Sequence, residues 1–142
     1  MRRFSLVWRD RIEFANGHTR EADGALLHCS HGLRAIVRTR FAGDLAAGTD
    51  EIVVDRYQGR RFNSPNDVVV KRDGSIWFSD PPYGIASNHE GHQADSELGD
   101  NYVFRFDPLT GALDIVTDFV EEPNGLAFSP DESVLYVSDT SA

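Results

Sequence analysis

The chain has 142 residues, which suits one ordinary domain or part of a larger one. Hydrophobic residues make up 40% and charged residues 26%, so the chain can build a packed core and is not intrinsically disordered. There are 14 basic and 23 acidic side chains, and the resulting net charge of −9 repels phosphate backbones, so we expect no nucleic-acid partner.

The beginning of the chain and its apolar runs bear on location. Residues 1–10 carry basic side chains but no apolar stretch of the length found in secretory signals. No apolar run approaches the roughly 20 residues of a membrane span. We therefore expect a soluble cytoplasmic protein with no membrane partner, although an N-terminal truncation would leave the same beginning.

Short apolar runs with a period near two recur along the whole chain, and turn residues separate them. No stretch of a dozen residues has the apolar spacing of a long amphipathic helix, so the pattern predicts an all-β fold. The predicted strands are, in chain order, Phe4–Trp8, Ala25–Cys29, Arg34–Phe41, Glu51–Asp55, Asp67–Val70, Ser75–Ser79, Tyr102–Phe106, Leu113–Asp118, Leu126–Phe128 and Val134–Ser138.

One long polar segment, residues 84–101, interrupts this pattern. It is acidic and poor in strand-forming residues. Either it is a solvated loop, or it overhangs a pocket, because long ordered loops in compact domains are often functional. The sequence favours neither interpretation.

The chain also repeats itself. Asn16, Asn66 and Asn124 are each followed, seven positions later, by an aspartate and then by an apolar strand. The asparagines stand 50 and 58 residues apart (66 − 16 and 124 − 66). A unit of short strands that recurs at this interval indicates a β-propeller.

The repeating asparagines are also candidate ligands. Equivalent positions of successive propeller blades converge near the central axis, and an amide carbonyl is a hard oxygen that suits calcium better than zinc or copper. Asn66 and Asn124 are therefore candidate calcium ligands. Their alternative role is local, because asparagine before glycine or aspartate commonly forms turns.

Histidine and cysteine offer little support for a different metal. His28 and His31 stand three apart, as do His89 and His92, without the carboxylate pattern of a zinc site. Cys29 is the single cysteine, which excludes an internal disulfide, and we expect it to pack as a small apolar group.

Several long motifs resemble the gluconolactonase branch of the senescence-marker-protein/gluconolactonase-like family. They follow the family's order from about Phe4 to the last residue. The matching segments are residues 14–20 (FANGHTR), 61–70 (RFNSPNDVVV), 73–84 (DGSIWFSDPPYG), 123–132 (PNGLAFSPDE) and 135–140 (LYVSDT).

This resemblance implies a six-bladed propeller that hydrolyses sugar lactones with a divalent metal, usually calcium, on its axis. It implies Asn66 and Asn124 as two metal ligands. The family's glutamate ligand, in a Glu-Gly-Pro-x-Trp motif, has no match here, since the acids of residues 9–13 lack that pattern. The aspartate that serves as ligand and general base is expected beyond Ala142.

We therefore expect one domain over residues 1–142, a partial propeller of about three blades, with repeat units around 4–60, 61–119 and 120–142, the last incomplete. The first functional hypothesis is a fragment of a metal-dependent sugar-lactone hydrolase. A second is a truncated, inactive propeller that acts as a binding or assembly module, with self-association through its open edges. A third keeps the metal but takes phosphoesters as substrate.

Further side chains are candidates for substrate contacts. Asn16 occupies the ligand position of the first repeat, with a turn as its alternative role. Arg20 could bind sugar oxygens or remain a solvated strand residue, and alternation directs His31 toward the pocket. Asp80 and Asp139 follow inner strands and either reach the axis or cap tight turns.

Overall fold

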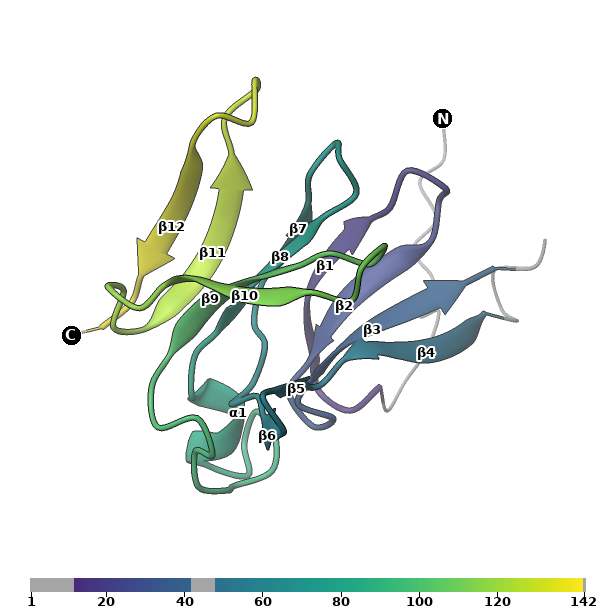
Figure 1. Ribbon diagram of the computed structural model, residues 1–142. Helices are drawn as coiled ribbons and strands as arrows, with labels where there is room; N and C mark the ends of the chain where they lie inside the picture. Colours follow the sequence, from purple (N-terminus) through teal and green to yellow (C-terminus); the bar gives the residue numbers. More distant parts are fainter. Residues whose placement is uncertain (1–11, 42–47, 142) are drawn as a thin grey trace, which may run out of the picture.

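The structure is a computed structural model that describes residues 12–41 and 48–141. Figure 1 shows an arrangement of antiparallel sheets with a single short helix in the described part, as the all-β prediction requires. None of the helical residues in these ranges forms a segment long and apolar enough to cross a membrane. The predicted strand Phe4–Trp8 lies outside the described residues.

Two four-stranded antiparallel sheets and one two-stranded sheet follow one another along the chain, each with neighbouring strands in sequence order. The first sheet holds β1 (Ala15–Arg20), β2 (Leu26–Ser30), β3 (Ala35–Arg40) and β4 (Thr49–Val54). The second holds β7 (Val68–Val70), β8 (Ile76–Asp80), β9 (Tyr102–Phe106) and β10 (Leu113–Thr117). The third pairs β11 (Pro123–Phe128) with β12 (Leu135–Asp139).

Two smaller elements connect these sheets. A tight hairpin of β5 (Arg56–Tyr57) and β6 (Arg60–Arg61) turns at Gln58 and Gly59, both with positive φ, and links the first sheet to the second. The short helix α1 (Tyr83–Ala86) follows β8 and opens the long polar loop. In Figure 1 this helix and loop lie at the lower end of the sheets, away from the β7–β8 turn at the top.

The first strands of the three sheets lie beside one another. β1 contacts β7, and β7 contacts β11. The backbone N–H of Gly17 on β1 donates to the carbonyl of Asn66, just before β7, over 2.8 Å. The N–H of Leu126 on β11 donates to the Asp67 carboxylate over 2.7 Å. Successive sheets are therefore joined through the strands that begin them, as the blades of a propeller are.

The core lies between the first two sheets. The rings of Phe62, Phe78 and Phe104 pack against one another with centroids 5.1–5.4 Å apart, and all three are fully buried. Leu27 and Cys29 of β2 join this cluster. Burying large apolar side chains of both sheets in one cluster holds them together, at about 25 cal/mol per Å² of apolar surface. Cys29 packs as a small apolar group.

The main difference from the sequence prediction is β1. Its residues, ANGHTR, are mostly polar and alternate between half-buried and exposed positions, so apolar periodicity does not detect it. The strand forms because β2 and β7 contact it on either side. The two-residue strands β5 and β6 also escape an apolar pattern, and β11 begins earlier than predicted, at Pro123.

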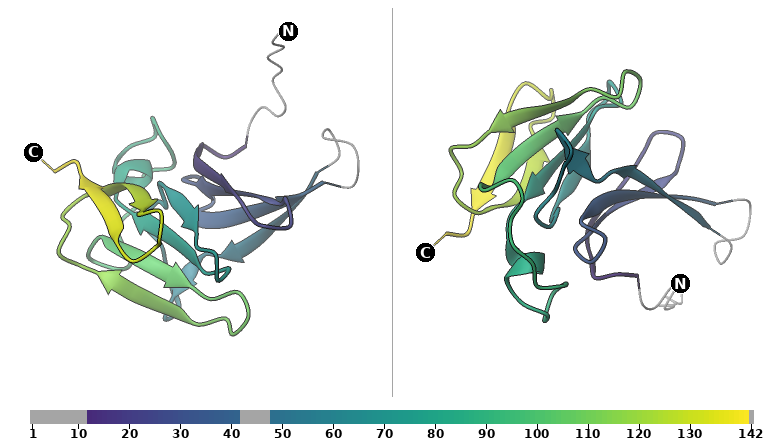
Figure 2. Two further views of the ribbon diagram at one scale, coloured as in Figure 1. Left: turned by 90° about the horizontal axis from the view of Figure 1, so that it is seen from above. Right: turned by 60° about the horizontal axis from the view of Figure 1, so that its bottom comes forward.

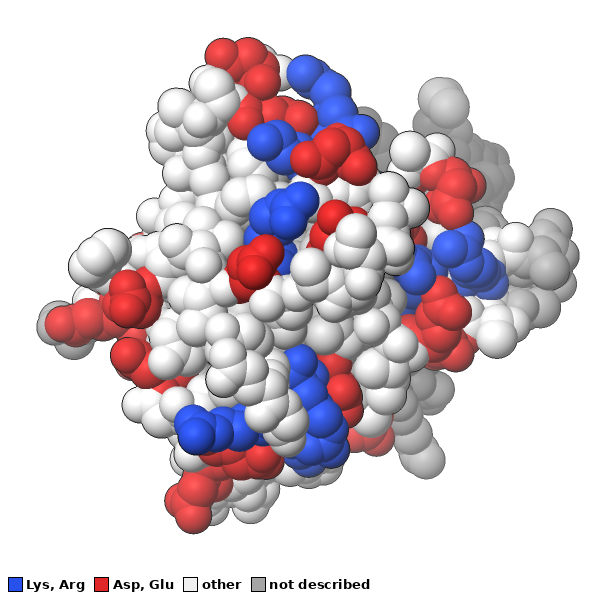
Figure 3. Space-filling model, in the orientation of Figure 1, with Lys and Arg blue, Asp and Glu red and all other residues white. Residues whose placement is uncertain are grey.

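Charged side chains are mixed over the visible surface. In the face shown in Figure 3, Lys and Arg lie beside Asp and Glu, so the net negative charge is not gathered there into one acidic patch. Arg38, for example, pairs with both Glu21 and Glu51 across the first sheet. The Arg38 and Glu21 side chains are each only 13% exposed, so this pair holds the sheet, while exposed pairs such as Arg40 with Asp23 contribute little to stability.

Candidate active site

Side chains from the first and second sheets meet at His31. This histidine follows β2, and only 2% of it is exposed. Its Nε2 lies 3.3 Å from the Nδ2 of Asn16 and 3.4 Å from the Nδ2 of Asn66. The structure thus brings together three of the predicted site residues: His31, Asn16, which is 15 positions before it, and Asn66, which is 35 positions after it.

A loop packs over the other side of the histidine. The Nδ1 of His31 lies 2.9 Å from the backbone carbonyl of Glu90. Burial lowers the pKa of His31, and the hydrogen bond to Glu90 opposes this in part, so the ring is neutral at pH 7. The polar loop 84–101 therefore overhangs the site, which supports the second of its two interpretations.

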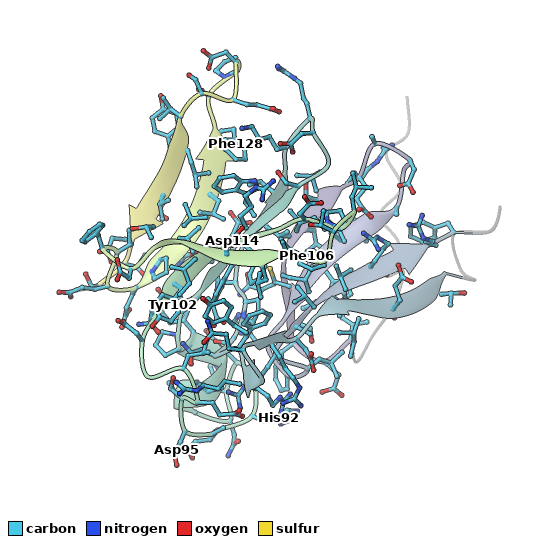
Figure 4. The ribbon with its side chains drawn as sticks, viewed as in Figure 1. His92, Asp95, Tyr102, Phe106, Asp114 and Phe128 are labelled. Carbon is cyan, nitrogen blue, oxygen red and sulfur yellow. The ribbon has the colours of Figure 1, made fainter. Side chains whose placement is uncertain are left out.

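Beside this cluster lies a pocket of about 250 Å³. It is lined by Phe14, Ala15, Asn16, His31, His89 and Glu90. His92 and Asp95, labelled in Figure 4, belong to the same loop and lie at the same lower end of the molecule, far from Phe128 at the top. The ring of His92 meets Phe14 edge-on, with centroids 5.4 Å apart. The loop thus forms one wall of the pocket.

Asn124 lies on the strand next to this cluster. The hydroxyl of Ser79 donates to the backbone carbonyl of Asn124 over 2.6 Å, while the carbonyl of Ser79 accepts from the N–H of Asn66 over 2.9 Å. One residue of β8 therefore connects both asparagines. Asn66, just before β7, and Asn124, on β11, therefore lie in neighbouring segments, and the convergence of their side chains on one axis stays a prediction.

Asp80 holds the loop that presents Asn66. Its carboxylate accepts hydrogen bonds from the backbone N–H groups of Asn63 and Ser64, each over 2.8 Å. The residue is fully buried, and burial raises the pKa of Asp80 to about 7 against the lowering effect of the two N–H donors and of Arg34. A carboxylate with no exposed surface makes no substrate contact, so the structure gives Asp80 a supporting role in place of the predicted one.

Asp139 repeats this arrangement one sheet later. Its carboxylate accepts from the N–H groups of Glu121 and Glu122, over 3.2 and 3.1 Å, and of Ser141, over 2.9 Å. These bonds lower the pKa of Asp139. The side chain thus holds the segment that precedes Asn124, as the predicted capping role requires, and a substrate contact of this exposed residue stays a prediction.

The structure does not bring Arg20 to this site. Arg20 ends β1, roughly 13 Å along the strand from Asn16 at 3.3 Å per residue. It lines a different pocket, of about 460 Å³, between the β1–β2 and β7–β8 turns. That pocket is larger but lies among exposed turns at the upper end of the sheets, so the smaller one beside His31 is the better candidate.

The amide oxygens fit a hard cation in type. Because the Nδ2 atoms of Asn16 and Asn66 face His31, their Oδ1 atoms lie on the other side of each amide, and neither has a hydrogen-bond partner among the described residues. The same holds for the side chain of Asn124. Neutral oxygens of this kind suit calcium.

In number, the donors form only part of a calcium shell. Calcium takes about six to eight oxygens, usually with some carboxylates. Within residues 12–41 and 48–141, no three His, Cys, Asp or Glu side chains are grouped so that they could hold a metal. The asparagines can therefore supply a portion of the ligands, and the described residues assign no carboxylate beside them.

Sequence reasoning missed the residues that hold the site in place. The contact of Asp80 with Asn63 and Ser64 could have been found. Asp80 and Asp139 follow their repeat asparagines at nearly the same spacing, which indicates that each aspartate binds the segment before its asparagine. Glu90 could not have been found, because it acts through its backbone carbonyl, which every residue carries. Gly84 and Gly91 could not have been found either: a Cβ on Gly84 would lie 2.6 Å from the Cβ of His31 and one on Gly91 2.1 Å from the carbonyl oxygen of Gly84, and such close packing is invisible in sequence.

Consecutive antiparallel sheets whose first strands meet around a shared polar site define the class of β-propellers. Residues 8–142 match the family described as the SMP-30/gluconolactonase/LRE-like region, and the chain belongs to this family. This membership confirms the predicted fold, a partial six-bladed propeller.

Individual relatives agree with this assignment. The chain is 40% identical, over 126 residues, to a gluconolactonase from Zymomonas mobilis, which covers 89% of this chain and 33% of the relative. It is 34% identical to the lactonohydrolase oryL of Aspergillus oryzae, over 70% of this chain and 22% of that protein. The solved structure of a gluconolactonase from Xanthomonas campestris matches with a TM-score of 0.84 and 46% identity, over 94% of this chain and 42% of that one.

The chain thus spans between about a fifth and two fifths of the length of these relatives. Its fold and family are shown by the match. What a whole relative does is a proposal for this chain.

Proposed function

We propose that this chain forms part of the active site of a sugar-lactone hydrolase that uses a divalent cation, calcium, held in part by Asn66 and Asn124. In the overall reaction, water adds to the lactone carbonyl carbon, the ring C–O bond breaks, and a hydroxy acid is released. A bound cation would supply Lewis-acid polarisation of that carbonyl. Relatives named as a gluconolactonase and a lactonohydrolase support the substrate class.

The observation that carries the proposal is the convergence of Asn16, His31 and Asn66 beside a pocket of about 250 Å³. The site is concave, and its polar groups come from two sheets and one loop. The amide oxygen of Asn66 has no partner among the described residues, although only 6% of the residue is exposed. Among the described residues the only fully buried side-chain nitrogen or oxygen without a partner belongs to Arg34, so the Asn66 oxygen reaches the surface and is free to bind a ligand.

The chain's own residues would bind and orient the substrate. Asn16 is exposed at the pocket and can hydrogen-bond sugar hydroxyls, while Phe14 supplies an apolar surface for the ring. His89 and Glu90 line the pocket and form one of its walls. No described carboxylate is assigned as general base, because Asp67 and Asp80 already accept backbone N–H groups.

A second candidate function is a binding or assembly module without catalysis. It is favoured by the same occupied carboxylates and by the short share of each relative that the chain spans. In this alternative the pocket binds the sugar ring and no bond is broken. The two candidates differ in a single measurable property, turnover.

The test is hydrolysis of glucono-1,5-lactone, followed as acid release in a weakly buffered indicator solution, with calcium and with a chelator. The full chain is compared with Asn66→Ala, Asn124→Ala and the control Gln93→Ala. Gln93 is exposed, and its side-chain amide has no partner among the described residues. We expect a calcium-dependent rate above the uncatalysed one, supplied by polarisation of the carbonyl alone because no general base is assigned. Either asparagine variant should lower this rate by at least about tenfold, and the control should leave it unchanged.

Other outcomes decide between the candidates. Lactone binding without turnover, seen by calorimetry, would leave the module as the function. Turnover that persists in chelator, or that survives both asparagine substitutions, would exclude the proposed metal role. Faster hydrolysis of an aryl phosphotriester than of the lactone would instead assign the phosphoester substrate.

A further inference from the structure

His31 lies at the centre of the candidate site and has contacts on both ring nitrogens. Its imidazole is buried against Gly84, and it contacts two asparagines on one side and the Glu90 carbonyl on the other. A buried histidine with this pattern does more than fill space. Which ring nitrogen donates and which accepts determines the role of His31.

The Glu90 contact fixes the tautomer. A backbone carbonyl can only accept a hydrogen bond, so at 2.9 Å the Nδ1 of His31 must carry the proton and donate it. In the neutral ring the Nε2 then has no proton and presents a lone pair. This lone pair lies on the side of the two asparagines.

The lone pair in turn fixes how the asparagine amides are turned. Nδ2 of Asn66 and Nδ2 of Asn16 lie 3.4 and 3.3 Å from Nε2, so both NH₂ groups donate toward one acceptor. An amide is nearly symmetric in shape, and without such a contact it can rotate by about 180° and exchange its oxygen and nitrogen. A rotated Asn66 would present NH₂, a donor with no acceptor capacity, where a cation needs oxygen.

Two glycines allow these contacts to form. A Cβ on Gly84 would lie 2.6 Å from the Cβ of His31 and 2.7 Å from its Cγ, so the ring packs directly on the Gly84 backbone. A Cβ on Gly91 would lie 2.1 Å from the carbonyl oxygen of Gly84. The loop that carries Glu90 can therefore lie close enough to reach the ring.

We propose that His31 is a positioning residue that, held by the Glu90 carbonyl, turns the Asn66 amide so that its Oδ1 faces the cation. This inference rests on the proposed function, because it gives a reason for the orientation of a proposed ligand. It places part of the control of metal affinity in the loop 84–91, which contributes no ligand. Residues that orient ligands from outside the ligand set typically alter metal affinity by about 10–100-fold.

The test compares two polar replacements of similar size. In His31→Gln the terminal amide reaches about as far as Nε2 and can offer its oxygen to Asn66. In His31→Asn the shorter amide reaches about as far as Nδ1, so it can donate to Glu90 but cannot reach Asn66. Calcium affinity is measured in the full chain from shifts of the Asn side-chain NH₂ signals in NMR spectra, which detect weak binding, with Asn66→Ala as the reference for a lost ligand.

We expect His31→Gln to bind calcium within about threefold of the wild-type chain and His31→Asn to bind at least about tenfold more weakly. The ¹⁵N shifts of the His31 ring, recorded without calcium, should show protonated Nδ1 and unprotonated Nε2. A purely structural histidine would not separate the two variants in this order once both are shown to be folded by their backbone spectra.

Failures of the two ideas are distinguishable. If both His31 variants bind as the wild type does while Asn66→Ala loses binding, the metal site stands and the positioning role is overturned. If the ring carries its proton on Nε2, the positioning role is overturned whatever the affinities. If Asn66→Ala binds calcium as well as the wild type, or the wild type does not bind it, the proposed metal role fails and this inference fails with it.

Discussion

Asp80 is a buried carboxyl that supports a ligand loop from beneath. Both of its oxygens accept backbone N–H groups, at Asn63 and Ser64, three and two residues before Asn66. A neutral asparagine or serine at position 80 lacks the charged carboxylate whose two oxygens accept these bonds, so it would bind the two N–H groups more weakly. The position of Asn66 therefore depends on a side chain that does not reach the pocket.

This burial predicts a pH dependence of stability. The pKa of Asp80 rises from an ordinary value of 3.8 to about 7 on folding, so between these pH values the folded chain binds more protons than the unfolded chain. Stability is therefore full below about pH 4 and is lost as the pH rises through 7, by about 4 kcal/mol at most. Asp80→Asn removes this titration.

The measurement is the free energy of urea unfolding from pH 4.5 to 8. We expect the difference between wild type and Asp80→Asn to shrink steadily as the pH rises, because other titrating groups cancel in the comparison. Parallel curves for the two proteins would show that the pKa of Asp80 is not raised on folding.

At the scale of elements, the repeated aspartate is explained by the hairpin turns. Asp23, Asp73 and Asp131 each lie between the first and second strands of a sheet, and each carboxylate accepts the backbone N–H two residues later, over 3.0, 2.9 and 3.2 Å. This is the bond of an Asx turn. The spacing of seven from the asparagine is the length of the first strand with its turn.

The turn bond predicts that two substitutions of Asp73 lower the free energy of unfolding by different amounts. Its carboxylate accepts both the N–H and the hydroxyl of Ser75 and is exposed. Asp73→Ala should lower the free energy of unfolding by about 1 kcal/mol, because both bonds are lost. Asp73→Asn keeps an accepting oxygen and should cost clearly less. Thermal unfolding of the three proteins measures this, and equal losses in both variants would show that charge, and not the turn bond, matters.

At the scale of the whole molecule, the sheets are joined through one repeated position. Gly17, Asp67 and Gly125 each follow a repeat asparagine. The Asp67 carboxylate lies between the two glycines. A Cβ added to Gly17 would lie 2.6 Å from its Oδ1, and a Cβ added to Gly125 would lie 3.9 Å from its Oδ2. In the two views of Figure 2 the three sheets spread outward from the region where their first strands meet.

This packing predicts unequal effects at equivalent positions. In Gly17→Ala the new Cβ would lie 2.6 Å from the Asn66 carbonyl oxygen and 2.7 Å from the Cα of Asp67, and backbone atoms cannot move aside cheaply. We expect a loss of about 1–3 kcal/mol in the free energy of unfolding.

Gly125→Ala is the matched control. Its nearest neighbour would be the Ser138 hydroxyl at 3.3 Å, so the substitution should change stability by less than about 1 kcal/mol, since the cost is offset by lower entropy of the unfolded chain. Equal effects at the two positions, measured by denaturant unfolding, would contradict close packing between the first two sheets.

Much of the fold and part of the site could be predicted from sequence. Short apolar runs separated by turn residues found most strands of the three sheets, although β2, β3 and β8 are buried at nearly every residue. The asparagine repeat placed Asn66 just before β7 and Asn124 on the neighbouring β11. The polar strand β1 was not found, because it is stabilised by its neighbours and not by its own apolar pattern. The sequence could not show that Asp80 is buried and that Arg20 lines a different pocket, because burial and distance are properties of the fold.

The sequence by itself determined the class of fold, the family and the identity of the candidate ligands, because these depend on alternation, repeat length and motifs that are local along the chain. Only the tertiary structure decided that His31 joins Asn16 to Asn66, that Glu90 holds it from above, and that Asp80 is sealed beneath the ligand loop. The reason is physical: hydrogen-bond direction and close approach depend on atoms far apart in sequence, several of them backbone atoms that every residue shares.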